Sequence, residues 1–369
     1  MTVVRGRLVM DDSVEFGELT IDNGLITDVQ LMPETDTSAP FVAPGFVDVH
    51  VHGWGGHSAM GNRAALDGMA RALLRRGVTS FLPTAVTAPL SALSSFAAGV
   101  REWLPYAPDD GAEPLGFNLE GPFLADARRG AHDPAHLRAP ADVSREDLAP
   151  VLESLRLITV APELPGALEL VAWLDSQGVR VSVGHSAASF EVARATYAAG
   201  ATSTTHLFNA MSGLDHRSPG VALAALLRDE VYVELIADGI HVAPELWPLI
   251  LRLKPAERLM LVSDAIPLAG TGDGVGKLGS LDIEIRGERV TLAGTNTFAG
   301  SVLALDKAVR NLVASGVALS AAVAAASRNP LQMLGVTDRG RLAAGQRADL
   351  VELDVDLNVH RVMRTGTWI

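Results

Sequence analysis

Two histidines in one short motif are well placed to bind a metal ion. His50 and His52 lie in Phe46–His52, which has the apolar pattern of a buried strand that ends at a glycine-rich turn. Side chains alternate between the two faces of a strand, so Asp48, His50 and His52 point to the same side. Two imidazoles at this spacing can hold one divalent ion. The alternative is a pair of core histidines whose rings are satisfied by backbone groups.

Residues of the types that bind metals also stand at the ends of later strand-like segments: Glu120, His185, His206 and Asp264. Nine of the ten histidines fall at such ends or in the loop after a strand, and only His360 does not. A lone histidine is more often a core or surface residue. Six such side chains on one face therefore predict a metal centre, although His57 and His216 have no assigned role.

A scaffold must bring these strand ends together. Apolar segments alternate with Ala-rich helical stretches, which is the pattern of βα units and a parallel sheet. Eight such units predict an α/β protein with a (β/α)₈ TIM barrel, whose active face is formed by the C-terminal strand ends and the following loops. The expected strands are Gly45–His52, Gly77–Pro83, Leu115–Glu120, Leu157–Pro162, Val179–His185, Ala201–His206, Val231–Asp238 and Leu259–Asp264. The expected helices include Ala64–Arg76, Ala167–Gln177, Ser189–Ala199 and Pro244–Leu253.

Both chain ends have the pattern of short strands. Val3–Val9 and Gly17–Ile21 are strand-like, and Asp22-Asn23-Gly24 is a hairpin turn signal. The segments 348–355 and 359–369 are similar. We therefore predict a small β-sandwich domain built from residues 1–43 and 340–369, and a catalytic barrel domain of residues 44–339.

Composition narrows the classes of partner and ligand. The chain has 369 residues, a net charge of −13 and no cysteine, so any metal must be held by His, Asp and Glu. The negative charge argues against nucleic acid and anionic membranes as partners, and it means that an anionic substrate needs a local basic pocket. No apolar run reaches the roughly 18 residues of a membrane span, and the start lacks signal-peptide features, so we expect a cytoplasmic protein.

The order His-x-His, Glu, His, His, Asp on successive strands resembles the amidohydrolase superfamily. The segment Gly340–Leu350 also resembles that superfamily's return into the small β domain. Many members bridge two metals with a carboxylated lysine. Here the three lysines, Lys254, Lys277 and Lys307, lie away from strand ends. The resemblance therefore implies that Glu120 takes the bridging role.

Within that superfamily, residues 43–349 resemble the N-acetylglucosamine-6-phosphate deacetylases. The matching motifs are Leu119–Phe123, Arg129–Pro134, Ala161–Glu163, Gly184–Ser186, Thr205–Met211, Asp238–Val242 and Ser263–Ala265. The resemblance implies hydrolysis of the acetamide of a phosphorylated amino sugar by a homodimer whose loops cross to the partner's site. It also implies one or two divalent ions per subunit. Zinc is the expected metal, with iron, cobalt or manganese as alternatives, since His and carboxylate ligands accept all four.

The resemblance assigns roles to the ligand-type residues. Glu120, His185 and His206 hold the first metal, and His50 and His52 hold a second one near Asp264. Asp264 is also the acid/base that moves a proton from the attacking water to the leaving amine. The alternative is that Asp264 is a plain metal ligand.

The substrate contacts are likewise implied by the resemblance. His132 polarises the acetamide carbonyl, or alternatively contacts only solvent or phosphate. Arg217 binds the phosphate through its planar guanidinium, or alternatively makes a surface ion pair. Further contacts are expected from Ala131, Asn209, Ala210, His241, Phe298, Ala299 and Gly300.

Three other functions remain open. One is deacetylation of a related sugar phosphate such as N-acetylgalactosamine-6-phosphate. Another is hydrolysis of N-acyl amino acids by a different amidohydrolase, although Arg217 and His241 weigh against an uncharged substrate. A third is a non-catalytic scaffold, which would be expected to have lost metal ligands that this chain retains.

Overall fold

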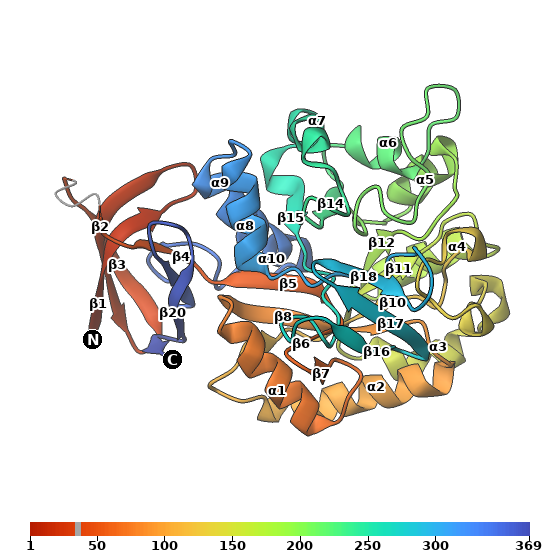
Figure 1. The fold of residues 1–369 in the computed structure, drawn as a ribbon, viewed down its shortest axis with the longest axis horizontal. Coiled ribbons are helices and arrows are strands. Elements are labelled where there is room, and N and C mark those ends of the chain that lie inside the picture. The colour runs from red at the N-terminus through yellow and green to blue at the C-terminus, as the bar shows by residue number, and fades with distance from the viewer. Residues whose placement is uncertain (34–37) are drawn as a thin grey trace.

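A computed structural model of the chain describes residues 1–33 and 38–369. Its centre is a barrel of eight parallel strands, in the order β15-β14-β13-β12-β11-β10-β8-β5 (Figure 1). Their bounds are β5 (Phe46–Val51), β8 (Val78–Val86), β10 (Phe117–Glu120), β11 (Leu155–Val160), β12 (Arg180–Val183), β13 (Ser203–Thr204), β14 (Tyr232–Leu235) and β15 (Leu259–Leu261). A short strand, β9 (Glu113–Pro114), pairs with β8 outside this order. The predicted barrel is confirmed, and each expected strand is present.

The strands are buried on both faces, as expected of a parallel sheet covered by helices. All six residues of β5 and all nine of β8 are buried. The predicted helices are confirmed, and the fourth begins with a 3₁₀ turn at Pro244–Leu246. The helices are α1 (Arg63–Leu74), α2 (Leu90–Trp103), α3 (Arg145–Leu152), α4 (Ala167–Ser176), α5 (Phe190–Ala198), α6 (Val221–Leu226), α7 (Trp247–Leu253), α8 (Leu305–Ala314), α9 (Leu319–Ala326) and α10 (Arg328–Leu334). None of them, over the described residues, has the length and apolar character needed to cross a membrane.

The two chain ends form a separate seven-stranded sheet beside the barrel (Figure 1). The order is β21 (Thr367–Trp368), β20 (Val359–Arg364), β19 (Leu350–Leu353), β4 (Phe41–Pro44), β1 (Thr2–Val9), β2 (Val14–Asp22) and β3 (Leu25–Leu31). All neighbours are antiparallel except β1 and β4, and the sheet has its own apolar cluster. Residues 34–37 of the predicted small domain lie outside the described residues, and the proposed boundaries at 43/44 and 339/340 remain predictions.

Two small sheets follow the first and last barrel strands and were not predicted. One pairs β6 (Gly53–Trp54) with β7 (His57–Ser58). The other is antiparallel and contains β16 (Gly274–Leu278), β17 (Leu281–Arg286) and β18 (Arg289–Leu292). Both come after strands whose ends carry candidate metal ligands. They therefore lie on the side of the barrel where the predicted active face is formed.

Candidate metal centre and substrate cavity

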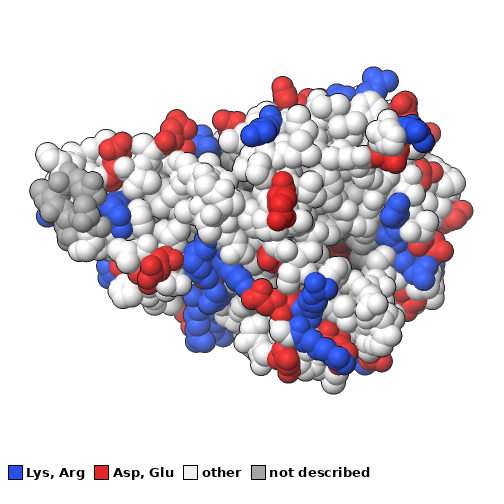
Figure 2. All heavy atoms as spheres, turned by 45° about the horizontal axis from the view of Figure 1, so that its top comes forward, with Lys and Arg blue, Asp and Glu red and all other residues white. Residues whose placement is uncertain are grey.

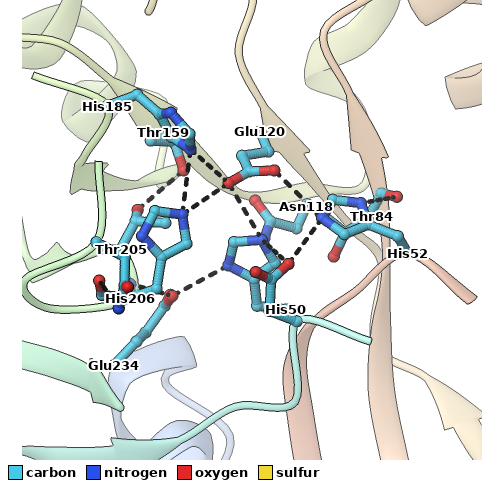
Figure 3. Close-up of polar contacts among 12 residues, drawn as sticks. His50, His52, Thr84, Asn118, Glu120, Thr159, His185, Thr205, His206 and Glu234 are labelled. Carbon is cyan, nitrogen blue, oxygen red and sulfur yellow. Dashed lines mark hydrogen bonds and ion pairs between the residues drawn. The ribbon is translucent and has the colours of Figure 1, made fainter. Parts of the chain in front are cut away.

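The carboxylate of Glu120, at the end of β10, is the centre of the candidate site. Its Oε1 is 3.0 Å from Nε2 of His185 and 2.9 Å from Nε2 of His206. Its Oε2 is 3.2 Å from Nε2 of His52 and 3.2 Å from Nε2 of His132. Figure 3 shows the carboxylate between the His185–His206 pair and the His50–His52 pair. One carboxylate therefore faces both histidine pairs.

The side chains form two groups whose ligand atoms lie within 4.8 Å of one another. One contains His50, His52, Glu120 and Asp264, and the other contains Glu120, His185 and His206. Asp264 Oδ1 is 3.1 Å from His52 Nε2 and 3.6 Å from His50 Nε2. Glu120 belongs to both groups, which is the arrangement needed for a carboxylate shared by two metal positions.

Three of these residues lie beyond their strands rather than within them. β12 ends at Val183 and β13 at Thr204, so His185 and His206 each follow two residues later. The φ angles of His185, His206 and Asp264 are 46°, 26° and 50°. Positive φ is uncommon for such residues and costs free energy, and it persists where the surrounding structure enforces it. The chain therefore bends at each of these residues, two or three positions after its strand has ended.

The outer nitrogens of three candidate ligand histidines have acceptors, whereas Nδ1 of His206 is buried without a partner among the described residues. His50 Nδ1 is 3.1 Å from Glu234 Oε2, and His52 Nδ1 is 3.2 Å from the carbonyl oxygen of Thr84. His185 Nδ1 is 2.8 Å from the carbonyl oxygen of Arg128. Each of these three Nδ1 atoms therefore donates its proton outward, which leaves the Nε2 lone pair directed into the site, as metal-binding histidines require.

Glu234, a fully buried residue of β14, was not predicted as part of the site. Its Oε2 contacts His50 and also accepts the backbone N–H of His206 at 3.1 Å. One oxygen thus holds a residue from each ligand group. An acidic residue in the interior of the apolar segment Val231–Asp238 was the signal for it, because a buried carboxylate needs a partner.

Glu163, in the motif Ala161–Glu163, is a second supporting residue that had no predicted role. Its carboxylate accepts the hydroxyl of Ser186 at 2.7 Å and the backbone N–H of Ala187 at 2.5 Å. These residues directly follow His185. Glu163 therefore fixes the turn on which that histidine is carried.

The buried carboxyl and imidazole groups of the site shift one another's pKa values. Burial opposes ionisation of Glu120, but His132 and His50 hold the pKa of its carboxyl well below the usual range. Burial and the nearby His132 lower the pKa of His185 to about 4. Burial opposes the charged form of His52, but hydrogen bonds with Asp264 and Glu120 raise its pKa to about 9. The carboxylates thus stay ionised in a dry site and favour positive charge there.

The residues fit a divalent ion on structural grounds. Nε2 atoms of His185 and His206 are 3.1 Å apart, and two neutral imidazole lone pairs at this distance repel unless a cation or a proton lies between them. Nε2 of His50 is buried without a hydrogen bond. A set of imidazole and carboxylate donors without thiolate suits zinc and neighbouring divalent metals.

His132 has a defined orientation. The backbone N–H of Thr87 donates to its Nδ1 at 3.3 Å, and the Thr87 hydroxyl is 2.9 Å from the same nitrogen. A neutral His132 therefore carries its proton on Nε2, the nitrogen that faces Glu120. That N–H is available to donate a hydrogen bond at the site.

A cavity of about 310 Å³ opens onto the candidate centre. His52, Glu120, His132, His185, His206 and Asp264 lie on its wall, with His50 buried behind them. The expected substrate residues that line it are Ala131, Asn209, Ala210, His241, Phe298 and Gly300. Arg128, Leu278 and Thr297 also line it and were not predicted. Leu278 comes from β16, so the added sheet forms part of the cavity.

Two expected substrate residues do not line this cavity. Ala299 is fully buried, and its N–H donates to the carbonyl oxygen of Val290 in the added sheet. Arg217 is exposed in a turn where Asp215 accepts the N–H groups of Arg217 and Ser218. The prediction of a direct Ala299 contact is therefore corrected. The structure does not bring Arg217 to the cavity of its own chain.

Comparisons with known proteins agree with this geometry. The sequence model of the amidohydrolase family matches residues 41–369. The chain belongs to the amidohydrolase family.

The relatives that match nearly the whole chain are more specific. N-acetylglucosamine-6-phosphate deacetylase of Bos taurus is 38% identical, over 99% of this chain and 90% of the relative. N-acetylgalactosamine-6-phosphate deacetylase of Escherichia coli O157:H7 is 37% identical, over 99% and 98%. These similarities confirm the resemblance to amino-sugar phosphate deacetylases that the motifs indicated.

Solved structures give the same result. N-acetylglucosamine-6-phosphate deacetylase of Thermotoga maritima superposes with a TM-score of 0.93 at 34% identity, covering 100% of this chain and 99% of the other. A Mycobacterium smegmatis variant in complex with N-acetyl-D-glucosamine-6-phosphate has a TM-score of 0.90 at 37% identity, with coverage of 100% and 98%. The barrel and the sheet of the chain ends therefore form one arrangement shared with these enzymes.

Proposed function

We propose that the chain hydrolyses the acetamide of N-acetylglucosamine-6-phosphate to glucosamine-6-phosphate and acetate. The observation that carries this proposal is the position of Glu120. Its carboxylate lies between two histidine pairs at the wall of a cavity that also exposes His132 and Asp264. The full-length similarity to deacetylases supports the choice of substrate.

One or two divalent ions, with zinc as the expected metal, would be held by the two ligand groups that share Glu120. A bound divalent ion supplies a water of lowered pKa and polarises the substrate carbonyl. His185 and His206 would hold the first position, and His50 and His52 the second. The Nδ1 hydrogen bonds of His50, His52 and His185 leave Nε2 of each ring as the nitrogen that faces the metal position.

Asp264 is the proposed acid/base. Burial opposes its ionisation, but the hydrogen bond with His52 and the charge of His50 hold the pKa of its carboxyl below the usual value. Asp264 therefore begins as a carboxylate that can accept a proton from the attacking water. The same oxygen then returns the proton to the amine as the C–N bond breaks.

His132 is the proposed donor to the developing oxyanion. Its Nε2–H is set by Thr87 and faces the cavity beside Glu120. A fixed donor in a buried site stabilises negative charge more than one in water. The alternative is that His132 contacts only solvent or phosphate; the 4% exposure of this residue argues against a contact with solvent alone.

The phosphate is assigned to Arg217 and His241. His241 lines the cavity, where Asp238 holds its Nδ1 at 2.6 Å. The exposed Arg217 is assigned to the phosphate in the cavity of the partner subunit of a homodimer. Acidic and basic groups are interspersed on the face drawn in Figure 2, with wide uncharged areas between them. Recognition of an anion by this cytoplasmic enzyme therefore depends on local groups.

The galacto epimer is a second candidate substrate, because the E. coli relative that acts on it is 37% identical over 99% of the chain. The test is a deacetylase assay on both N-acetylated hexosamine 6-phosphates before and after chelation, with metal analysis of the same samples. We expect chelation to abolish turnover and added zinc to restore it. Absence of turnover on both sugars in zinc-loaded protein would refute the proposal.

A further inference from the structure

A second cavity, of about 410 Å³, adjoins the cavity of the candidate metal centre. Much of its wall is apolar and comes from Met60, Val86, Ala88, Pro89 and Pro267. His52 and Leu278 line both cavities, so these side chains separate the two spaces. None of the residues assigned to the sugar or the phosphate lines the second cavity.

The positions of the two cavities indicate which way the acyl group of a bound substrate points. The sugar contacts Asn209, Ala210 and His241 all lie on the first cavity. His132, the proposed donor to the carbonyl oxygen, is held by Thr87, and Thr87 lines the second cavity. An acyl chain leaves the carbonyl carbon on the side away from the amide nitrogen. With the sugar in the first cavity, the chain therefore points toward Leu278 and the second cavity.

We propose that the second cavity binds the acyl chain of substrates with N-acyl groups longer than acetyl, such as N-butyrylglucosamine-6-phosphate. This inference rests on the proposed function. Water adds its oxygen to the carbonyl carbon, the C–N bond breaks, and a proton passes to nitrogen. The products are butyrate and glucosamine-6-phosphate.

The polar groups at the rim of the second cavity favour an uncharged aliphatic chain. Lys277 is paired with Asp282 at 3.0 Å, and the hydroxyl of Ser280 donates to Asp133 at 2.7 Å. Their charges and hydrogen bonds are thus already matched within the chain. The apolar wall then rewards burial of methylene groups.

Leu278 controls passage between the cavities. It is the last residue of β16, and 6% of its surface is exposed. Leucine has rotatable bonds, so its side chain can turn aside for a chain that a rigid backbone wall would block. Removing it joins the two cavities, and filling the second cavity from the side of Ala88 or Met60 blocks the chain without replacing any candidate metal ligand.

The test compares kcat/KM for the N-acetyl and N-butyryl substrates in zinc-loaded variants. Each buried methylene changes affinity about fourfold, so the two additional ones are worth about 15-fold. Ala88→Phe fills the cavity and should lower the butyryl/acetyl ratio by about that factor, whereas Leu278→Ala should raise it. The matched control is Ala195→Phe on the exposed face of α5, which should leave the ratio unchanged.

Met60→Trp serves as a second filling variant, and circular dichroism checks the fold of each protein. A ratio that stays the same in wild type, Ala88→Phe and Met60→Trp overturns the acyl site. The same conclusion follows if wild type and Leu278→Ala hydrolyse the acetyl substrate but not the butyryl one. Loss of turnover on the acetyl substrate in wild type would instead count against the proposed function.

Discussion

Glu234 offers a direct test of how the two ligand groups are held together. Its Oε2 accepts a hydrogen bond from His50 Nδ1 and another from the backbone N–H of His206, each at 3.1 Å. The variant Glu234→Gln keeps the size and one acceptor oxygen but removes the charge. We expect it to bind zinc more weakly at both positions, because each ligand group loses a charged contact.

The magnitude follows from the two contacts. A hydrogen bond to a charged group contributes about 1 kcal/mol more than a neutral one, so losing the charge costs about 2 kcal/mol in all. That corresponds to a roughly fivefold loss of affinity at each metal position, or roughly 30-fold for the two positions together. The combined value lies within the 10- to 100-fold loss typical of residues that orient metal ligands. Glu234→Ala should be worse, since it leaves two buried donors without an acceptor.

The assay is zinc affinity by competition with a chromogenic chelator, together with zinc content after dialysis. Neither readout requires turnover. Glu169→Gln, on the exposed face of α4, is the matched control because it removes the same charge far from any buried partner. If Glu234→Gln binds zinc as tightly as Glu169→Gln at both positions, the argument that Glu234 orients the ligands is wrong.

Four further outcomes are expected. Protein loaded with excess zinc should hold close to two equivalents, and the double change His50→Asn, His52→Asn should lower this to about one. Equal zinc content in both proteins would contradict a second metal position at these histidines. Asp264→Asn should reduce kcat by roughly 10²–10⁴, as for a lost acid/base group, and near-normal turnover in metal-loaded protein rules that role out. Arg217→Ala should raise KM for the phosphorylated sugar by about 10- to 150-fold and leave unphosphorylated N-acetylglucosamine almost unaffected, whereas equal losses on both sugars point to a structural role. Burial opposes ionisation of Glu113, but Arg339 and Arg347 hold the pKa of its carboxyl below the usual value. Glu113→Gln should therefore lower the free energy of unfolding by about 1–3 kcal/mol at neutral pH. The interaction with the arginines stabilises only the ionised carboxylate, so this difference in unfolding free energy should vanish as the pH falls through the folded-state pKa. Denaturant titrations that give equal differences at pH 7 and pH 3 would argue against this role of Glu113.

The barrel strands could be predicted because burial on both faces leaves a strong local pattern. Phe46–His52 is apolar except where Asp48 and the two histidines interrupt it. Polar side chains survive in such a segment only where they have partners, and strand ends bring partners together. The same logic should have identified Glu234, whose carboxylate interrupts another apolar strand. It was overlooked because its partner, His50, is 184 residues away in the chain.

The added sheet and the loop positions were harder to predict. Leu281–Arg286 does alternate apolar and polar residues, but its neighbours Gly274 and Gly276 weaken the signal for β16. The location of Arg217 follows from a turn held by Asp215, and a turn's direction relative to a distant cavity is a tertiary property. The residue types of the site could thus be predicted from the sequence. The part of the cavity wall that comes from β16 and the position of the Arg217 turn could not.

The seam of the barrel explains why the ligands and the fold depend on each other. β15 and β5 form no strand ladder, yet the N–H of Asp264 donates to the carbonyl oxygen of His50 at 2.9 Å. The N–H of His52 likewise donates to the carbonyl oxygen of Ala265 at 2.8 Å. The first and last strands are therefore joined through the backbone of the ligand-bearing residues themselves. A divalent cation held by their side chains would also stabilise the closed barrel, because His50, His52 and Asp264 come together only when the seam is closed.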